Sequence, residues 1–216
     1  MMVVEIWSDV MCPFCYIGKR RFEEALARFP ARDRVRVVWK SFQLDPDIEG
    51  GAGVSVVEYL ARRKGWSLDQ SRAVHDQVIR MAKTAGLDYD FDRAVVANTF
   101  DAHRLVQFAK THGRDEDVEE GLFRAYFTEG KDIGDHEVLV GIAREAGLDA
   151  AEARSALAEG RFRAEVERDL LEARQVGVTG VPFFLFDRTH AISGAHEAET
   201  FLEILAEALP DPGAAP

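Results

Sequence analysis

The chain has 216 residues, of which 47% are hydrophobic and 30% are charged, so wholesale disorder is excluded. Its length suits one large domain, or a smaller domain that carries an insertion. It has 27 Lys and Arg residues against 38 Asp and Glu residues, a net charge of −11. This acidic balance argues against nucleic acid or an anionic membrane as a partner.

The chain contains two cysteines, too few for the disulfide framework of a small secreted protein. The N-terminus has neither a basic segment nor an unbroken apolar one, so we expect no signal peptide. No stretch approaches the roughly 18 apolar residues that a membrane span needs. We therefore predict a cytoplasmic protein whose thiols are kept reduced.

The first part of the chain predicts a strand–helix–strand unit. Val3–Trp7 and Val35–Phe42 have the apolar, β-branched character of strands, and Cys12–Phe29 has apolar residues at helical spacing. Pro13 suits the first turn of that helix, where its missing N–H costs nothing. Such a unit favours parallel strands joined by a right-handed crossover.

A connector rich in Asp, Gly and Pro, 44–53, then leads into a long helical block without a convincing strand. Ser67 and Asp149 each precede a helical segment and are typical N-cap residues. The helices expected from apolar periodicity are 56–64, 68–85, 93–112, 116–129, 137–146, 150–159 and 162–175.

Strand character returns near the C-terminus. Pro182–Phe186 is a short apolar run, Ala191–Ser193 a second short strand, and Glu197–Leu209 an amphipathic helix. The order is therefore β-α-β, a helical block, then β-β-α. This order predicts one α/β core interrupted by a helical insertion.

The motif Cys12-Pro13-Phe14-Cys15 lies where the first strand ends and the first helix begins. A helix N-terminus presents unpaired N–H groups and a partial positive charge, and both stabilise a thiolate. We predict that Cys12 is exposed at the cap and attacks, and that Cys15 is more buried and resolves. Lys19, Arg20 and Arg21 are expected to add a favourable field.

Two plainer interpretations compete with a redox pair. A Cys-x-x-Cys pair can be half of a zinc site, but the chain has no other cysteine, and His190 and His196 lie far downstream. We therefore predict no metal. Two buried, inert cysteines are the second alternative, which the strand–turn–helix context disfavours.

The segment Gly177–Phe183 places a proline at the entrance of a strand after a glycine-rich turn. A cis Val181–Pro182 bond would present the Val181 backbone to an extended substrate. From the residues alone a trans bond is favoured, because only about 5–6% of X–Pro bonds are cis.

The chain resembles thioredoxin-fold proteins of the DsbA-like family, and most of all their cytosolic FrnE-like branch. The resemblance extends over essentially the whole chain, including the helical block. It rests on the segments SDVMCPFCYIGKRRFE (8–23), NTFDAHRL (98–105), FTEGKDIGD (127–135), GVTGVPFFLF (177–186) and ISGAHEAETF (192–201).

This resemblance implies an α/β thioredoxin fold with a large all-helical insertion between its β-α-β and β-β-α halves. The thioredoxin-like domain would comprise 1–50 and 176–216, and the insertion 51–175. The resemblance also implies a redox-active Cys12/Cys15 pair, with a cis Pro182 beside it. Thiol–disulfide exchange is the expected reaction, and the expected substrate-binding residues are Pro13, Phe14, Val181 and Pro182.

Phe14 stands where periplasmic relatives often carry histidine, so a strongly oxidising poise is not implied. In a reducing cytosol, disulfide reduction or isomerisation is favoured over net oxidation. A sibling branch contains 2-hydroxychromene-2-carboxylate isomerases and kappa-type glutathione transferases, which resemble this chain near Asn98 but lack the cysteine pair. A glutathione-dependent isomerase or transferase for a small aromatic substrate is thus the alternative, and a non-catalytic, chaperone-like binding module is a further one.

Asn98 and His103 share one predicted helix and are candidate groove residues, although an isolated helical histidine more often has a structural role. No cofactor is expected beyond the redox-active disulfide, with glutathione as a candidate co-substrate. The expected partners are a protein or small-molecule disulfide and glutathione or a thioredoxin-type recycling protein. A monomer or a homodimer is expected.

Overall fold

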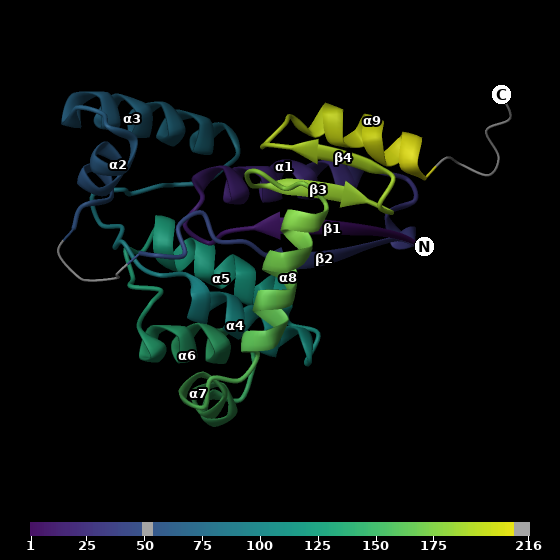
Figure 1. Ribbon diagram of the computed structural model, residues 1–216. Coiled ribbons are helices and arrows are strands. Elements are labelled where there is room, and N and C mark those ends of the chain that lie inside the picture. The colour runs from purple at the N-terminus through teal and green to yellow at the C-terminus, as the bar shows by residue number, and fades with distance from the viewer. Residues whose placement is uncertain (49–53, 210–216) are drawn as a thin grey trace, which may run out of the picture.

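The computed structural model describes residues 1–48 and 54–209. Strands occur near the two ends of the chain, and the long middle part is helical (Figure 1). The first part contains β1 (Met2–Ser8), α1 (Pro13–Arg28), the 3-10 helix η1 (Arg32–Arg34) and β2 (Val35–Ser41). The middle contains α2 (Val56–Lys64), α3 (Leu68–Thr84), α4 (Phe100–Lys110), α5 (Asp115–Phe127), α6 (His136–Glu145), α7 (Ala150–Ala158) and α8 (Arg163–Gln175). The last part contains β3 (Phe183–Phe186), β4 (His190–Ser193) and α9 (Ala198–Ala208).

The four strands form one mixed sheet in the order β2-β1-β3-β4. β1 pairs with β2 in parallel and with β3 antiparallel, and Ile6 lies opposite Trp39 on one side and Phe184 on the other. β4 pairs antiparallel with β3 at the edge. The β-α-β and β-β-α halves expected from the sequence thus meet in the middle of one sheet, where β1 and β3 lie side by side.

Both faces of the sheet are covered by helices. On one face α1 and α9 pack together, and Phe22 of α1 meets Phe201 of α9 edge to face, with ring centroids 5.6 Å apart. On the other face the buried Trp7 side chain packs against Ala173 of α8. The Trp7 indole N–H also donates to the Asp169 carbonyl oxygen of α8 at 3.1 Å. Coverage on both faces explains why β1 is an almost continuous apolar run.

The helices of the middle part form two groups in Figure 1. α4 to α7 pack below the sheet, while α2 and α3 pack against each other at one side. Tyr16 of α1 stacks on Phe123 of α5, with ring centroids 4.8 Å apart, and so ties the lower group to the helix that carries the cysteines. Within the described ranges, no helix combines the length and the apolar character that a bilayer crossing requires.

Local capping chemistry places two helix starts as predicted. The Ser67 hydroxyl accepts a hydrogen bond from the Gln70 N–H at 3.1 Å, and Asp149 accepts one from the Glu152 N–H at 2.8 Å. α4, in contrast, begins at Phe100, so the helix predicted from residue 93 is wrong at its start. Asn98 accepts a hydrogen bond from the Phe100 N–H at 2.9 Å and holds the preceding segment outside the helix.

The predicted division at residues 50 and 51 lies outside the described residues. α8, which the prediction assigns to the insertion, packs on the sheet and contacts β2. The last helix of the predicted insertion, α8, therefore packs against the core sheet, and β3 follows it in the chain.

Candidate functional site

The Cys-Pro-Phe-Cys motif opens α1, as the sequence indicates. Cys12 is the N-cap residue with extended backbone angles, φ −87° and ψ 112°, and Pro13 begins the helix. The Cys15 N–H donates to the Cys12 carbonyl oxygen at 3.0 Å, which closes the first turn. Both cysteines are free thiols. The motif thus places one sulfur at the helix start and the other one turn into the helix.

Cys12 is only 3% exposed, so the prediction of an exposed cap thiol is wrong. Its Sγ donates to the Val181 carbonyl oxygen at 3.4 Å, and the loop before β3 covers it from that side. The residue is nevertheless part of the wall of a cavity of about 330 Å³. Cys12 therefore lies in the wall of a hollow, and not on a convex surface.

Cys15 is buried more deeply, with 1% of its surface exposed. Burial raises the pKa of the Cys15 thiol well above its usual value, and the adjacent Cys12 sulfur raises it further. The Asp9 backbone and the Ser8 hydroxyl oppose this rise. Cys15 is therefore a protonated thiol at neutral pH, which suits a group that reacts second.

The Val181–Pro182 peptide bond is cis, the isomer that the family resemblance implies. The Pro182 carbonyl accepts a hydrogen bond from the Gly194 N–H at 2.8 Å, which ties this loop to the end of β4. Val181 and Pro13 line the same cavity as Cys12, as does Phe14, whose side chain is 39% exposed. Pro182 itself lies behind this wall, in contact range of Gly18 on α1.

The close approach of Pro182 to α1 yields a first prediction. A β-carbon at Gly18 would lie 3.0 Å from Pro182 Cγ, nearer than ordinary van der Waals contact. Gly18→Ala should therefore be less stable than Gly141→Ala, because a β-carbon at Gly141 in α6 meets no described atom within 4 Å. The Gly141 variant should gain up to about 1 kcal/mol from helix propensity. Urea unfolding of both variants measures this difference, and an equal gain for the two would contradict the packing.

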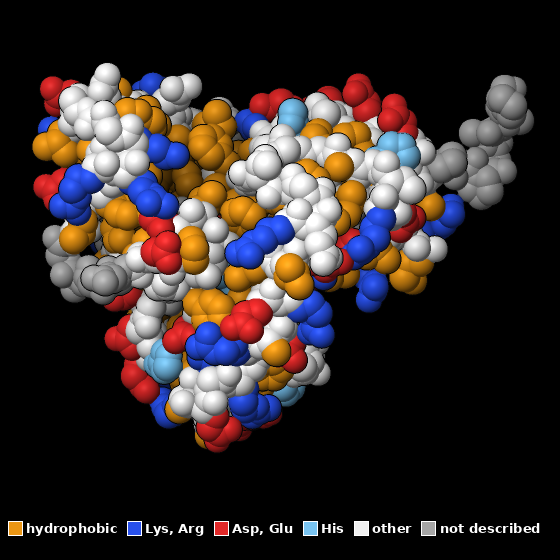
Figure 2. Space-filling model, in the orientation of Figure 1, with side chains coloured by type: hydrophobic (Ala, Val, Ile, Leu, Met, Phe, Trp, Pro, Cys, Tyr) orange, Lys and Arg blue, Asp and Glu red, His pale blue; other side chains and the backbone are white. Residues whose placement is uncertain are grey.

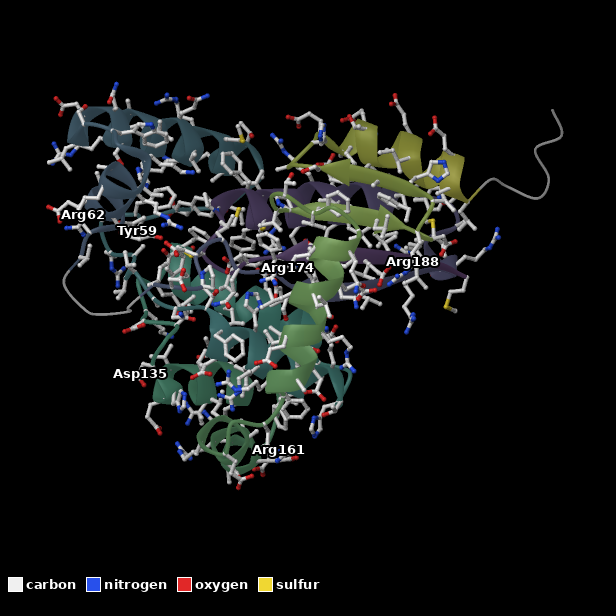
Figure 3. The ribbon with its side chains drawn as sticks, in the orientation of Figure 1. Tyr59, Arg62, Asp135, Arg161, Arg174 and Arg188 are labelled. Atoms are coloured by element: carbon white, nitrogen blue, oxygen red, sulfur yellow. The ribbon has the colours of Figure 1, made fainter. Side chains whose placement is uncertain are left out.

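The cavity beside Cys12 is mostly apolar, and much of its wall was not anticipated from the sequence. Figure 2 shows hydrophobic side chains gathered in the hollow between α3 and the β3–β4 side of the molecule. Figure 3 shows Tyr59 and Arg62 projecting from α2, and Tyr59 belongs to the wall. The other aromatic side chains that line the cavity are Phe14, Trp66, Phe91 and Tyr126. Trp66 and Val74 are large apolar residues within otherwise polar segments, and both are partly exposed to solvent. Their presence there could have indicated a binding surface from the sequence.

The basic residues of α1 are neutralised by carboxylates, contrary to the predicted field. Lys19 pairs with Glu120 of α5 at 2.9 Å and with Glu23, and Arg20 pairs with the same two glutamates. Arg21 donates to the Ala195 carbonyl at 2.6 Å. These three side chains therefore fasten α1 to its neighbours.

Asn98 and His103 do not line the cavity beside Cys12. Asn98 borders a separate polar hollow of about 530 Å³ together with Asp101, Asp132 and Arg163. Its amide donates to the Pro46 carbonyl at 3.0 Å, which makes it a link between loops.

The groove role predicted for His103 is corrected, because its side chain is 2% exposed and its Nε2 lies 3.4 Å from an oxygen of the buried Asp9. Helical spacing alone did not reveal that this face of α4 packs inward.

Among the described residues, no three His, Cys, Asp or Glu side chains are grouped so that they could hold a metal ion. His196 places its Nε2 2.9 Å from the Ser193 carbonyl oxygen, in the loop after β4.

The sequence model of the DsbA-like thioredoxin domain matches residues 3–206, nearly the whole chain. The chain belongs to the DsbA-like family. The α/β thioredoxin fold with a helical insertion, expected from the sequence, is thereby confirmed. Members of this family are generally oxidoreductases or isomerases, so membership supports an enzyme.

Among known proteins, this DsbA-like chain is 30% identical over 207 residues to the uncharacterized protein YwbO of Bacillus subtilis (strain 168), with 94% of this chain and 96% of YwbO covered. It is 42% identical to the probable DsbA oxidoreductase SCO1869 from Streptomyces coelicolor, whose crystal structure superposes with a TM-score of 0.93 over 100% of this chain and 93% of that one.

The cytosolic disulfide reductase DsbM from Pseudomonas aeruginosa shares the fold at 17% identity, with a TM-score of 0.66 over 95% of this chain and 97% of that one.

Proposed function

We propose that this DsbA-like protein is a dithiol–disulfide oxidoreductase that reduces or isomerises disulfides. One observation carries the proposal: the Cys12 sulfur lies at the N-cap of α1, in the wall of an apolar cavity and 3.4 Å from the Val181 carbonyl. A sulfur at a helix start faces unpaired backbone N–H groups, which suits a nucleophile, and the cavity gives a substrate room beside it. Cys15, buried and protonated, is held one turn away.

The chemistry follows from this asymmetry. The Cys12 thiolate attacks one sulfur of a substrate disulfide, forms a mixed disulfide and releases the other substrate sulfur as a thiolate. The Cys15 sulfur then attacks Cys12, and the second substrate thiolate leaves. Two electrons pass to the substrate, and the enzyme ends as the Cys12–Cys15 disulfide. A reductant of the thiol class, glutathione or a thioredoxin-type protein, must restore the dithiol.

The shape of the site supports a protein or small-molecule disulfide as the substrate. Val181 borders the cavity, and its backbone is expected to lie alongside an extended chain; Pro13 and Phe14 line the same cavity. Glutathione is a candidate because the fold relative DsbM has been solved with GSH. A cytoplasmic setting, and a monomer or homodimer, remain part of the proposal.

Replacing Cys15 tests the order of the two thiols. In Cys15→Ser, the Cys12 thiolate still attacks, but no second thiol resolves the product, so a stable mixed disulfide should accumulate at one equivalent per chain. Intact-protein mass spectrometry after reaction with oxidised glutathione measures this. Wild type treated in the same way should carry little adduct. A Cys15→Ser protein that fails to form the adduct would argue against Cys12 as the attacking thiol.

A glutathione-dependent isomerase or transferase is the second candidate. The observation that favours it is the aromatic wall of the cavity, whose volume of about 330 Å³ suits a small aromatic molecule. This function requires glutathione binding and does not require Cys15. Turnover of an aromatic substrate by Cys15→Ser in the presence of glutathione would favour it over disulfide exchange.

A chaperone-like binding module is the third candidate, and the exposed apolar side chains Phe14, Leu44, Trp66 and Val74 around the cavity favour it. It needs no reactive sulfur. Alkylation of Cys12 by iodoacetamide at neutral pH separates the cases, because a slow reaction favours a binding module and a fast one favours disulfide exchange.

A further inference from the structure

Two residues in the wall of the cavity beside Cys12 carry polar atoms that the proposed disulfide exchange does not use. They are His75 of α3, through its Nε2 atom, and Tyr126 of α5, through its hydroxyl group. Both residues are buried, with 5% and 1% of their surfaces exposed. Most of the remaining wall is apolar (Figure 2). A few polar groups in an apolar wall are what orients and selects a ligand.

His75 presents an unpaired hydrogen-bond acceptor. Its Nδ1 lies 2.7 Å from the carbonyl oxygen of Ser71, one turn earlier in α3. A carbonyl oxygen can only accept, so Nδ1 carries the proton, and Nε2 of the neutral ring is left as an acceptor. Nε2 has no hydrogen-bond partner within residues 1–48 and 54–209. Leaving a buried acceptor unpaired is unfavourable, and a ligand that donates to it removes that cost.

Tyr126 differs from the other three tyrosines of the chain in its hydroxyl group. The hydroxyl groups of Tyr16, Tyr59 and Tyr89 donate to a glutamate, an aspartate and a backbone carbonyl. The Tyr126 hydroxyl bonds to no residue in the described part of the chain, although a buried tyrosine hydroxyl usually has a partner. Burial raises the pKa of this phenol, so the hydroxyl keeps its proton and can donate to a ligand.

The rest of the wall suits an aromatic ring. Phe91 meets His75 edge to face, with ring centroids 4.6 Å apart, and Phe14 and Trp66 are partly exposed in the same wall. Aromatic rings pack favourably against one another in such arrangements. A phenol adds a hydroxyl that both donates and accepts, whereas an indole only donates and a phenyl ring does neither. A phenol therefore fits the apolar wall and both polar atoms.

We propose that the cavity selects disulfides flanked by tyrosine, and that His75 and Tyr126 recognise the tyrosine hydroxyl group. That hydroxyl donates to His75 Nε2 and accepts from Tyr126, while its ring packs on the aromatic wall. The inference rests on the proposed disulfide exchange and names the substrate class. A site that bonds a substrate hydroxyl discriminates against the analogue that lacks it, so phenylalanine is the comparison that matters.

Two peptide disulfides test the selection: the symmetrical dimers of blocked Tyr-Cys-Tyr and Phe-Cys-Phe, which differ only in their hydroxyl groups. Wild type, recycled with dithiothreitol, should reduce the tyrosine disulfide with a kcat/KM about 10-fold higher, the effect of one or two neutral hydrogen bonds. The uncatalysed rate with dithiothreitol is subtracted for each peptide. Equal kcat/KM values in wild type overturn the proposal, and this measurement needs no variant.

Two substitutions assign the selection to its residues. Tyr126→Phe removes only a hydroxyl without a partner, and His75→Leu removes the acceptor. Each should lower the tyrosine-to-phenylalanine ratio of kcat/KM by about 3-fold or more. Tyr89→Phe is the matched control, because Tyr89 is buried but lies outside the cavity wall and should leave the ratio unchanged.

The ratio separates recognition from a structural role, because a structural defect slows the reduction of both peptides alike. The His75 ring also borders a smaller hollow of about 210 Å³, and a role confined to that hollow would leave the ratio unchanged. An unchanged ratio in Tyr126→Phe, or in a folded His75→Leu protein, overturns the proposal.

Calorimetry separates this selection from the disulfide chemistry. S-methylated Tyr-Cys-Tyr and Phe-Cys-Phe have no reactive sulfur, and wild type should bind the tyrosine peptide with a Kd about 10-fold lower. If wild type reduces neither disulfide, the proposed function fails and calorimetry alone decides the selection. Tighter binding of the tyrosine peptide then supports it, and equal binding or no binding overturns it.

Discussion

Replacing Cys12 with serine is expected to reduce disulfide exchange by more than about 100-fold, to the uncatalysed rate. A serine hydroxyl does not ionise at neutral pH, and Cys15 cannot substitute because burial holds it as a protonated thiol. Reduction of oxidised glutathione or of a disulfide-bonded peptide, with a thiol reductant to recycle the enzyme, measures the loss.

The serine variant should keep the wild-type fold, because Cys12 makes a single weak hydrogen bond through its sulfur, to Val181. Its urea unfolding curve is the control that separates lost chemistry from lost structure. Activity at the wild-type level in a folded Cys12→Ser protein would contradict the mechanism.

The second large effect concerns stability. Asp169 of α8 is buried and accepts hydrogen bonds from Gln107 of α4 at 2.6 Å, from the Ser41 N–H of β2 at 3.1 Å and from Lys40 at 3.0 Å. Asp169→Ala leaves these donors without that partner, and we expect it to lower the free energy of unfolding by about 3–5 kcal/mol. Urea unfolding followed by circular dichroism measures the change.

Glu167 supplies the matched control for Asp169. It lies on the same helix and pairs with Arg163 at 3.6 Å, but both side chains are largely exposed. Glu167→Ala should lower the free energy of unfolding by less than about 1 kcal/mol, as for other surface ion pairs. Similar losses for the two variants would show that Asp169 does not join α8 to the sheet as the structure indicates.

Much of the fold was predictable because short-range sequence patterns determine where most of its helices and strands lie. Apolar periodicity and capping residues located nearly all the helices, and Ser67 and Asp149 cap α3 and α7 as expected. The main error was the start of α4, where Asn98 bonds to loop carbonyls instead of continuing a helix. The loop conformation of Asn98 depends on its hydrogen bond to Pro46, 52 positions away in the chain. The spacing of apolar residues contains no information about such a distant contact.

The position of the cysteine pair was predictable from the sequence, and its surroundings were not. The Cys-x-x-Cys spacing and the helix start pointed to Cys12 and Cys15, and the resemblance pointed to the loop at Val181 and Pro182. The burial of Cys12 was missed because it arises from Val181, 169 positions away. The aromatic wall, which includes Tyr59 of α2 and Tyr126 of α5, and the inward position of His103 were missed for the same reason.

The order of residues alone placed the cysteine pair at the start of α1, because a helix start is defined by neighbours within one turn. It also determined the strand and helix succession, since periodicity and capping act over a few residues. Only the tertiary structure decided how enclosed Cys12 is and which side chains form the cavity. Those properties depend on desolvation and packing by segments that are distant in the chain, such as α5 and the loop before β3.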